Sequence, residues 1–295
     1  AQESTQQAIN DGAKIIIGPL RAESATAAAQ TASGRGVNVL AFSNNAAIAG
    51  GNLFVLGQTF DSTATRLVDY AVGQGRDRIL TIFANNDTGR VGKVAIDRAI
   101  ATNGAVSAGN VSYEFSQEAV INAVPDIRSS AETNQANAIF FTANTAGALP
   151  LFTQMLPESG LDTETTQYIG LSRWDTPPQT LELPGVQGGW FALPDPQRNS
   201  QFRARYEAAY GNPPHALAGL AYDGIAAVGA LASSGKSDAL TRSSLIQPAG
   251  FQGVNGVFRF MPDGTNQRAL AVATVENKEV VVISPAPTSF GSAGF

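Results

Sequence analysis

Strand-like and helix-like segments alternate along the first two thirds of the chain. The β-branched run Lys14–Gly18 is followed by an alanine-rich helical segment at 22–33 and then by the strand-like run Val37–Phe42. The same alternation continues to about residue 193. Strands that are separated by helices at this spacing form parallel sheets with helices on both faces. The sequence therefore predicts an α/β fold.

The pattern changes after residue 193. Two helical segments, at 200–210 and 215–233, follow each other directly, and the chain then ends in a tail rich in strand-forming residues. A chain of 295 residues is long enough to form two domains. We therefore expect two α/β lobes between which the chain passes more than once.

The composition excludes several classes of function. Only 15% of the residues are charged and the net charge is -5, which leaves no basic stripe to bind nucleic acid. The chain has no cysteine and one histidine, so thiolate chemistry is excluded and no histidine cluster can hold a metal. The longest uncharged stretch, 133–157, contains too many amide side chains to cross a bilayer. These features predict no cofactor, no metal site, no nucleic-acid partner and no transmembrane segment.

The sequence also lacks a recognisable set of catalytic residues. His215 follows two prolines at an expected helix start, where we expect a capping or surface role, and no G-x-S-x-G sequence presents a serine nucleophile. The glycines at 73 and 75 precede a strand, whereas a dinucleotide-binding loop follows one. We therefore predict a protein without enzymatic activity.

Polar loops directly follow several predicted strands. They are Gly18–Glu23, Ser43–Asn45, Asn85–Thr88, Asn144–Thr145 and Ser172–Trp174. Ligands of open α/β sheets bind beyond the carboxyl ends of the strands. One interpretation is that these residues only form turns and helix caps. The other, which the number of such loops favours, is a hydrogen-bonding cleft with the indole of Trp174 standing at its mouth as an aromatic wall.

Several segments, taken in order, resemble a known family. They are Ile16–Leu20, Gly36–Ser43, Arg78–Gly92, Tyr206–Pro214 and Ala221–Gly224. Their order and spacing resemble the type I periplasmic solute-binding family of branched-chain amino-acid receptors, over nearly the whole chain. The tail is most similar to the branch of lipoproteins that activate penicillin-binding proteins, on the residues Gly253–Phe260, Pro262–Gly264 and Pro285–Pro287.

The resemblance implies a clamshell of two lobes, each a mainly parallel sheet flanked by helices. Three crossings join the lobes, which close on a ligand. Carried over to this chain, lobe 1 comprises 1–58 and 194–256, and lobe 2 comprises 59–193 and 257–295. The family pattern opens with a βαβ unit ahead of the segment that matches Lys14–Gly18, and we expect that this unit has been trimmed from the chain. The alternative is a lobe 1 that has lost its central strand.

The resemblance also implies which residues contact the ligand. They are Arg21, Ala22, Glu23, Ser43, Asn44, Asn45, Asn86, Thr88, Asn144, Thr145, Ser172, Arg173, Trp174 and Tyr222. Thr88 and Asn144 stand where the family has aromatic residues, and the acidic partner of an amino-acid ammonium falls near Ser172. Because a buried ammonium without a carboxylate is costly, we expect that free α-amino acids do not bind.

The resemblance implies a non-enzymatic periplasmic binding protein that closes on a small polar ligand. It also implies that this protein activates a penicillin-binding protein, which is a peptidoglycan synthase. The alternative is the substrate-binding component of an ABC transporter. It would deliver a small polar or anionic solute other than a free α-amino acid to a membrane permease. In both cases we expect a periplasmic location, and we further expect a lipid anchor on a segment ahead of residue 1.

Overall fold

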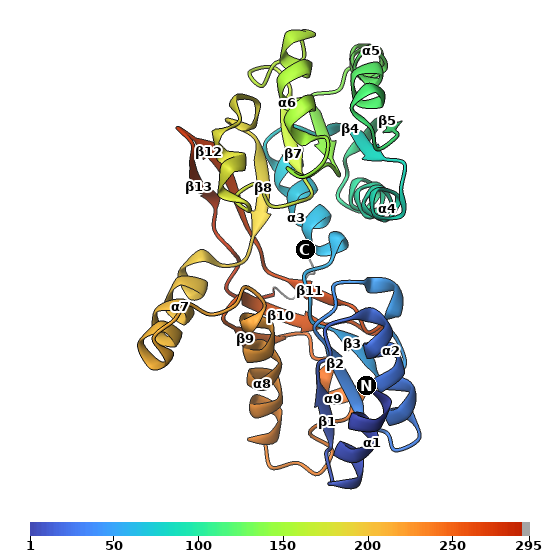
Figure 1. Cartoon of the computed structure of the whole chain (residues 1–295), viewed down its shortest axis with the longest axis vertical. Helices are drawn as coiled ribbons and strands as arrows, with labels where there is room; N and C mark the ends of the chain where they lie inside the picture. The colour runs from blue at the N-terminus through green and yellow to red at the C-terminus, as the bar shows by residue number, and fades with distance from the viewer. Residues whose placement is uncertain (291–295) are drawn as a thin grey trace. The chain divides into compact units, whose positions relative to one another are not determined.

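The computed structural model describes residues 1–290, which form two compact units (Figure 1). Unit 1 contains Ala1–Thr59, Pro194–Ala269 and the described residues from 286, and unit 2 contains Phe60–Leu193 and Leu270–Pro285. Each unit has its own sheets and its own hydrophobic core, so each is described by itself.

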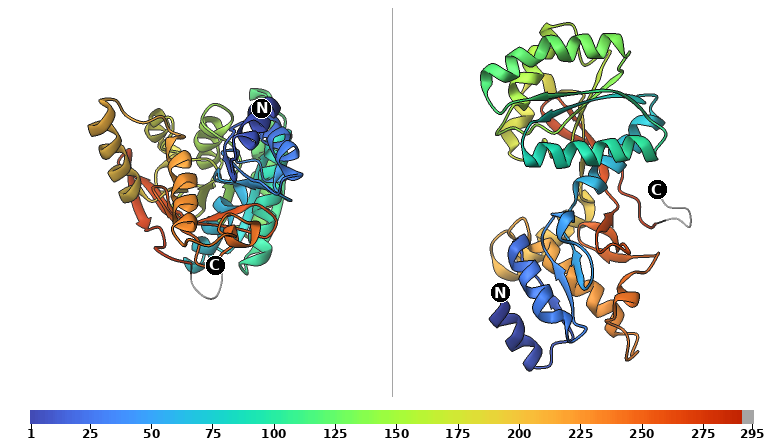
Figure 2. Two further views of the ribbon diagram at one scale, coloured as in Figure 1. Left: turned by 90° about the horizontal axis from the view of Figure 1, so that it is seen from below. Right: turned by 90° about the vertical axis from the view of Figure 1, so that its right-hand side faces the viewer.

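Unit 2 is built on one seven-stranded sheet in the order β13-β12-β8-β7-β6-β4-β5. The strands are β4 (Arg78–Ala84), β5 (Val106–Tyr113), β6 (Ala138–Phe141), β7 (Gln167–Gly170), β8 (Trp190–Leu193), β12 (Ala271–Glu276) and β13 (Glu279–Ser284). Strands β4 to β8 run parallel to one another, whereas β12 pairs antiparallel with β8 and β13. The helices are α3 (Phe60–Gly73), α4 (Asp87–Thr102), α5 (Gln117–Thr133), α6 (Leu149–Glu158), η2 (Pro178–Glu182) and η3 (Pro184–Val186). Figure 2 (right) shows helices on both faces of this sheet.

The centre of the unit 2 sheet is apolar on both faces. Every residue of β6 is buried, which is the pattern of a parallel strand covered by helices on both sides. Helix α3 contributes Ala64, Leu67, Val68 and Ala71 to the buried cluster that contains Phe140 of β6. Their i, i+3, i+4, i+7 spacing forms one helical face, so the apolar pattern of α3 fixes which side of it packs on the sheet.

Unit 1 contains two smaller sheets. The parallel sheet is β1 (Ile15–Ile17), β2 (Asn38–Ala41) and β3 (Leu53–Val55), and the antiparallel sheet is β9 (Phe251–Gly253), β10 (Gly256–Phe260) and β11 (Asn266–Arg268). The helices are α1 (Gln2–Asn10), α2 (Ala22–Ser33), η1 (Ala46–Ile48), α7 (Pro196–Tyr210), α8 (Ala218–Ala232) and α9 (Arg242–Leu245). One core cluster joins the two sheets, since Leu40 and Phe54 of the first pack with Phe251, Phe258 and Phe260 of the second.

The predicted α/β fold with mainly parallel sheets flanked by helices is confirmed. The first two predicted boundaries, after residues 58 and 193, lie within one residue of those in the structure. The third, after residue 256, differs, because β10 pairs with β9 and β11 and buries Phe258 and Phe260 in the core of unit 1. Only Leu270–Pro285 joins unit 2, and the chain then returns to unit 1. It therefore passes between the units after residues 59, 193, 269 and 285, one crossing more than the resemblance implies.

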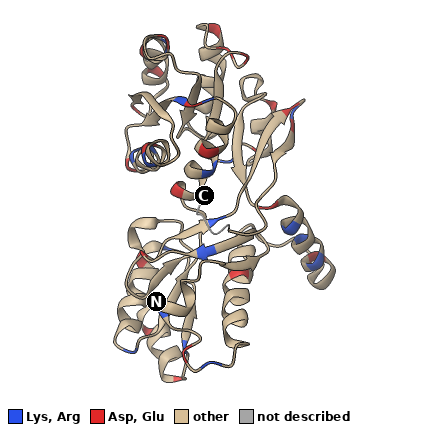
Figure 3. Ribbon diagram, turned by 180° about the vertical axis from the view of Figure 1, so that it is seen from behind, with Lys and Arg blue, Asp and Glu red and all other residues tan. Residues whose placement is uncertain are grey.

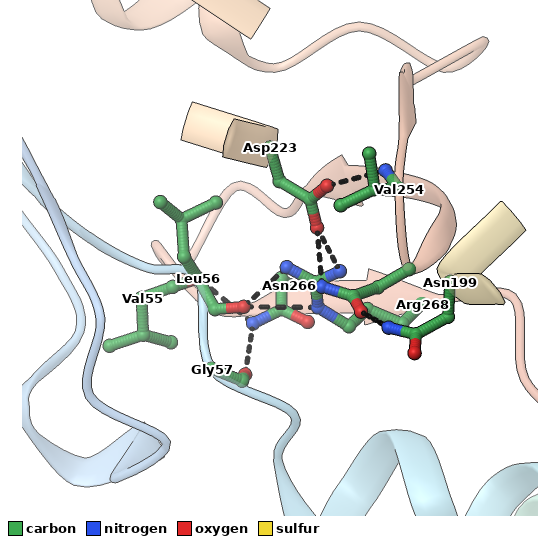
Figure 4. Close-up of polar contacts among 9 residues, drawn as sticks. Val55, Leu56, Gly57, Asn199, Asp223, Val254, Asn266 and Arg268 are labelled. Carbon is green, nitrogen blue, oxygen red and sulfur yellow. Dashed lines mark hydrogen bonds and ion pairs between the residues drawn. The ribbon is translucent and has the colours of Figure 1, made fainter. Parts of the chain in front are cut away.

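A buried polar cluster in unit 1 lies next to two of these crossings (Figure 4). Asp223 of α8 and Arg268 of β11 form an ion pair at 2.8 Å, with side-chain exposures of 0% and 2%. Arg268 Nη2 also donates to the carbonyl oxygen of Leu56 at 2.6 Å, and Asp223 Oδ1 accepts from the backbone N–H of Val254 at 2.8 Å. Asn266 Nδ2 donates to the carbonyl oxygens on either side of Leu56. The cluster therefore fastens α8, β9–β11 and the end of β3 to one another.

The surface of each unit carries charges of both signs. Figure 3 shows Lys and Arg distributed among Asp and Glu. Helix α7 contains Arg198, Arg203 and Arg205. Among residues 1–290, no helix is long and apolar enough to span a membrane.

Candidate functional site

The carboxyl ends of the parallel strands of unit 2 meet at one edge of its sheet. β4 lies between β5 and β6, and β6 is followed by β7, all in parallel. The loops after them carry Asn86, Thr88, Asn144, Thr145 and Ser172. The structure therefore brings these predicted residues to one edge. We call it the unit 2 edge and define it as residues 85–90, 114–117, 144–147 and 172–175.

The loop after β4 caps α4. Asn86 Oδ1 accepts a hydrogen bond from the N–H of Gly89 at 2.8 Å. Gly89 passes so close to the strand that an added Cβ would lie 2.0 Å from the carbonyl oxygen of Ala84. The capping interpretation thus holds for Asn86, while Thr88 stays exposed.

A chain of polar contacts links the loops after β4 and β5. Arg90 pairs with Asp87 at 2.7 Å and donates through Nη1 to Asn85 Oδ1 at 2.9 Å. Asn85 Nδ2 in turn donates to Glu114 Oε1 at 2.5 Å. All of these side chains are exposed. Since Arg90 and Glu114 each have a partner in this chain of contacts, their positions at the edge are fixed from within unit 2.

Tyr113 ends β5, and its carbonyl oxygen accepts from the N–H of Asn85 at 2.8 Å. Its ring packs edge-on against Phe152 of α6, with centroids 4.9 Å apart. Burial raises the pKa of Tyr113 to about 12. The phenol is therefore neutral at physiological pH and supports the edge by packing rather than by charge.

The loop after β6 carries one amide side chain that is exposed to solvent and one hydroxyl that is hydrogen-bonded within unit 2. Asn144 is exposed, and its backbone carbonyl accepts from the N–H groups of Gly147 and Leu149. Thr145 Oγ1 lies 2.6 Å from Thr180 Oγ1 of η2. The Thr145 hydroxyl is thus part of the internal packing, whereas the Asn144 amide has access to solvent.

The segment after β7 contains an acidic residue that sequence reasoning missed. Arg173 Nε donates to Asp175 Oδ1 at 2.8 Å, and Arg173 Nη2 contacts Asp175 Oδ2. The Asp175 side chain is only 15% exposed. The Arg-x-Asp sequence, with opposite charges two residues apart, is the signal that could have revealed this pair. Ser172, next to Arg173, is half-buried.

The predicted role of Trp174 at the mouth of a cleft is wrong. Its side chain has an exposure of 0% and packs with Phe191 of β8, at a centroid distance of 6.3 Å. Two glycines make room for the indole, because a Cβ added at Gly170 or at Gly189 would lie 2.2 Å from it. Trp174 is therefore a core residue of unit 2. The sequence suggested otherwise because Trp174 lies in a polar loop just past the predicted strand that ends at Gly170.

Apart from Tyr222, the predicted residues of unit 1 lie in the loops after β1 and β2 and at the start of α2. The N–H of Phe42 donates to the carbonyl oxygen of Pro19 at 2.9 Å and joins the two loops. We define the unit 1 edge as residues 19–24 and 43–47. No side chain caps α2, which begins at Ala22, and Arg21 and Glu23 are exposed around that helix start.

The second loop of the unit 1 edge is internally hydrogen-bonded. Ser43 is buried, and its hydroxyl accepts from the N–H of Asn45 at 3.1 Å. Asn45 Oδ1 accepts from the N–H of Ala47 at 3.0 Å and caps η1. Asn44 is exposed. Asn44 is therefore the predicted residue of this loop that is most open to a ligand.

The remaining predicted aromatic, Tyr222, lies on α8. It is 44% exposed and packs edge-on against Phe202 of α7 at 5.5 Å. Nearby in the chain, His215 is exposed, and its Nδ1 accepts from the N–H of Leu217 at 3.2 Å. Helix α8 begins at Ala218 without a side-chain cap, so His215 is a surface residue rather than the cap of this helix.

Each of the two edges carries exposed groups that can form hydrogen bonds. In residues 1–290, no group of three His, Cys, Asp or Glu side chains is placed to hold a metal ion. Asn44 and Asn144 supply exposed amides, Thr88 an exposed hydroxyl and Arg21 an exposed cation. Such groups orient a small polar molecule.

Comparison with known proteins places this arrangement in a family. The family described as "Periplasmic binding protein" matches residues 1–279. No curated protein matches the chain.

Solved structures share the fold at low sequence identity. A protein of Rhodospirillum rubrum assigned to branched-chain amino acid ABC transport is 19% identical, with a TM-score of 0.77, over 96% of this chain and 84% of that one. An ABC transporter substrate-binding protein from Desulfitobacterium hafniense in complex with Leu is 18% identical, with a TM-score of 0.68, over 96% and 84%. A solute-binding protein of an ABC transporter from R. palustris in complex with benzoate is 15% identical, with a TM-score of 0.61, over 100% and 84%.

These likenesses establish a shared fold, and the family match covers nearly all of the chain. The family implies a periplasmic or extracellular location. With its two α/β units and its match over residues 1–279, the chain belongs to the periplasmic binding protein family.

Proposed function

We propose that the chain is the non-enzymatic solute-binding component of an ABC transporter and that its ligand is a small carboxylic acid without an α-ammonium group. The family and the named relatives support the first part, since the structures reported above are named as ABC transporter proteins. The family and these structures favour a role in transport. The activator role is supported only by the resemblance of the tail sequence. The second part rests on the charged groups at the two edges.

The observation that carries the proposal is the pairing of Asp175 with Arg173. Both carboxylate oxygens of Asp175 contact the Arg173 guanidinium. A bidentate pair of this kind is among the stronger hydrogen-bonded contacts of a protein. Asp175 is therefore not free to compensate the ammonium of an amino acid, although it lies where the family resemblance puts the acidic partner.

The unit 1 edge supports the carboxylate part of the proposal. The first N–H groups of α2 have no side-chain cap, and Arg21 is exposed just before them. Uncapped N–H groups and the helix dipole favour an anion at this position. Glu23, in the first turn, is the acidic side chain next to them and is exposed to solvent.

A thermal-shift screen of the whole chain tests the proposal. We expect that benzoate, 3,4-dihydroxybenzoate or succinate raises the melting temperature by several degrees, whereas leucine and glutamate leave it unchanged. A ligand at a hundred times its Kd stabilises the folded state by about 2.7 kcal/mol. Stabilisation by leucine or glutamate alone contradicts the proposed ligand class, and no shift with any compound contradicts the binding function.

Two single variants test whether the acid binds at the unit 2 edge. Asn144→Ala should reduce the shift produced by the bound acid without lowering the melting temperature of the free protein, because Asn144 is exposed. Asn212→Ala removes an exposed amide outside both edges and should change neither quantity.

A further inference from the structure

Phe115 is the most exposed large apolar side chain of unit 2. Its exposure is 68%, and it lies between the end of β5 and Ser116, the N-cap of α5. Burial of such a ring stabilises a fold, so an exposed ring at the unit 2 edge contributes nothing of this kind. The ring is available to a molecule that binds there.

The Phe115 ring reaches across the edge toward the loop after β6. A Cβ added at Gly147 would lie 3.1 Å from Phe115 Cε2 and 3.4 Å from Asn144 Oδ1. β5 and β6 are not neighbours, because β4 lies between them. The ring therefore spans the end of β4 and lies beside the exposed Asn144 amide.

Polar groups also lie next to Phe115 in the chain. Glu114, the preceding residue, accepts a hydrogen bond from Asn85, which is held in turn by Arg90. Gly147 lets the ring and the Asn144 amide approach the same backbone position, since a Cβ added there would crowd both groups. The result is an aromatic surface with hydrogen-bonding groups within a few ångströms of it.

We propose that Phe115 is a specificity-determining residue that stacks on a planar apolar group of the ligand while Asn144 hydrogen-bonds to its polar substituents. This inference rests on the proposed function and narrows it to planar aromatic acids. Aromatic groups stack in offset or edge-to-face arrangements that are worth more than their buried area alone. Sequence reasoning located the family's aromatic positions at Thr88 and Asn144 and found them polar, whereas the ring here comes from the end of a different strand.

Calorimetric titration of the whole chain tests the proposal with benzoate and cyclohexanecarboxylate. Both probes carry one carboxylate on a six-membered carbon ring, but only benzoate is flat. We expect the parent to bind benzoate about tenfold more tightly than cyclohexanecarboxylate. Phe115→Leu keeps an apolar side chain and should lose most of this preference, whereas Phe115→Tyr should retain it.

The control is Val282→Ala, which truncates an exposed apolar residue on β13, at the opposite end of the sheet from β5. It should leave both affinities unchanged. Benzoate binding with an unchanged preference in Phe115→Leu overturns the role of Phe115 and leaves the proposed function standing. A parent that binds leucine or succinate but not benzoate also overturns this inference. A parent that binds none of these compounds overturns the proposed function as well.

Discussion

Asp223→Ala is expected to lower the free energy of unfolding of unit 1 by about 3–5 kcal/mol, which is typical when one partner of a buried ion pair is removed. The substitution leaves the Arg268 guanidinium buried at 2% exposure without its carboxylate. It also takes away the acceptor of the Val254 N–H. Gly253 shows how closely the carboxylate is enclosed, because a Cβ added there would lie 2.3 Å from Asp223 Oδ1. The loss is measured by denaturant unfolding followed by circular dichroism, since both tryptophans lie in unit 2.

The matched control for Asp223→Ala is Glu132→Ala. Glu132 pairs with Arg128 at 2.8 Å, but their side chains are 59% and 53% exposed. Exposed pairs contribute at most about 1 kcal/mol. The double variant Asp223→Leu, Arg268→Met should lose less than the sum of the single substitutions, because no charge is then left alone in the interior. Equal losses for Asp223→Ala and Glu132→Ala contradict the importance of the buried cluster.

Trp174→Ala is expected to destabilise unit 2 by about 3–5 kcal/mol, as is usual when a packed tryptophan is truncated. The indole is completely buried between Gly170, Gly189 and Phe191, so its loss leaves a cavity. Denaturant unfolding monitored by the fluorescence of Trp190, on β8 of the same unit, measures the change.

Trp174→Phe should cost less than Trp174→Ala. It leaves a smaller cavity and removes an indole N–H that has no hydrogen-bond partner among the described residues. A buried donor without a partner costs free energy, so losing it offsets part of the lost packing. A loss below about 1 kcal/mol in Trp174→Ala contradicts its place in the core.

The fold was predictable because its strands and helices follow from local patterns of apolar residues in the sequence. The buried run at 138–141 and the i, i+3, i+4 spacing on α3 identify a covered parallel strand and the helix that covers it. The third boundary was not predictable, because β10 and β12 have the same apolar, strand-forming character. Only their pairing, β10 with β9 and β12 with β8, assigns them to different units.

The candidate site was predictable in part for a similar reason. Chain order places Asn86, Thr88 and Asn144 after parallel strands, so their common edge follows from the fold. Contacts between loops do not follow from chain order. The approach of Phe115 to Gly147 depends on β4 lying between β5 and β6, and the burial of Trp174 depends on two glycines that are 19 residues apart in the sequence.

The most direct test of the central claim, that the carboxyl ends of the strands bind a small acid, is to map amide chemical shifts of the labelled chain during a benzoate titration. We expect saturable changes at the amides of residues 86–90, 115–117 and 144–147, and at the start of α2. The amides at the opposite ends of the same strands, such as Arg78, Ala138 and Gln167, should stay unchanged. Changes concentrated at those opposite ends, or no saturable change at any amide, contradict the account.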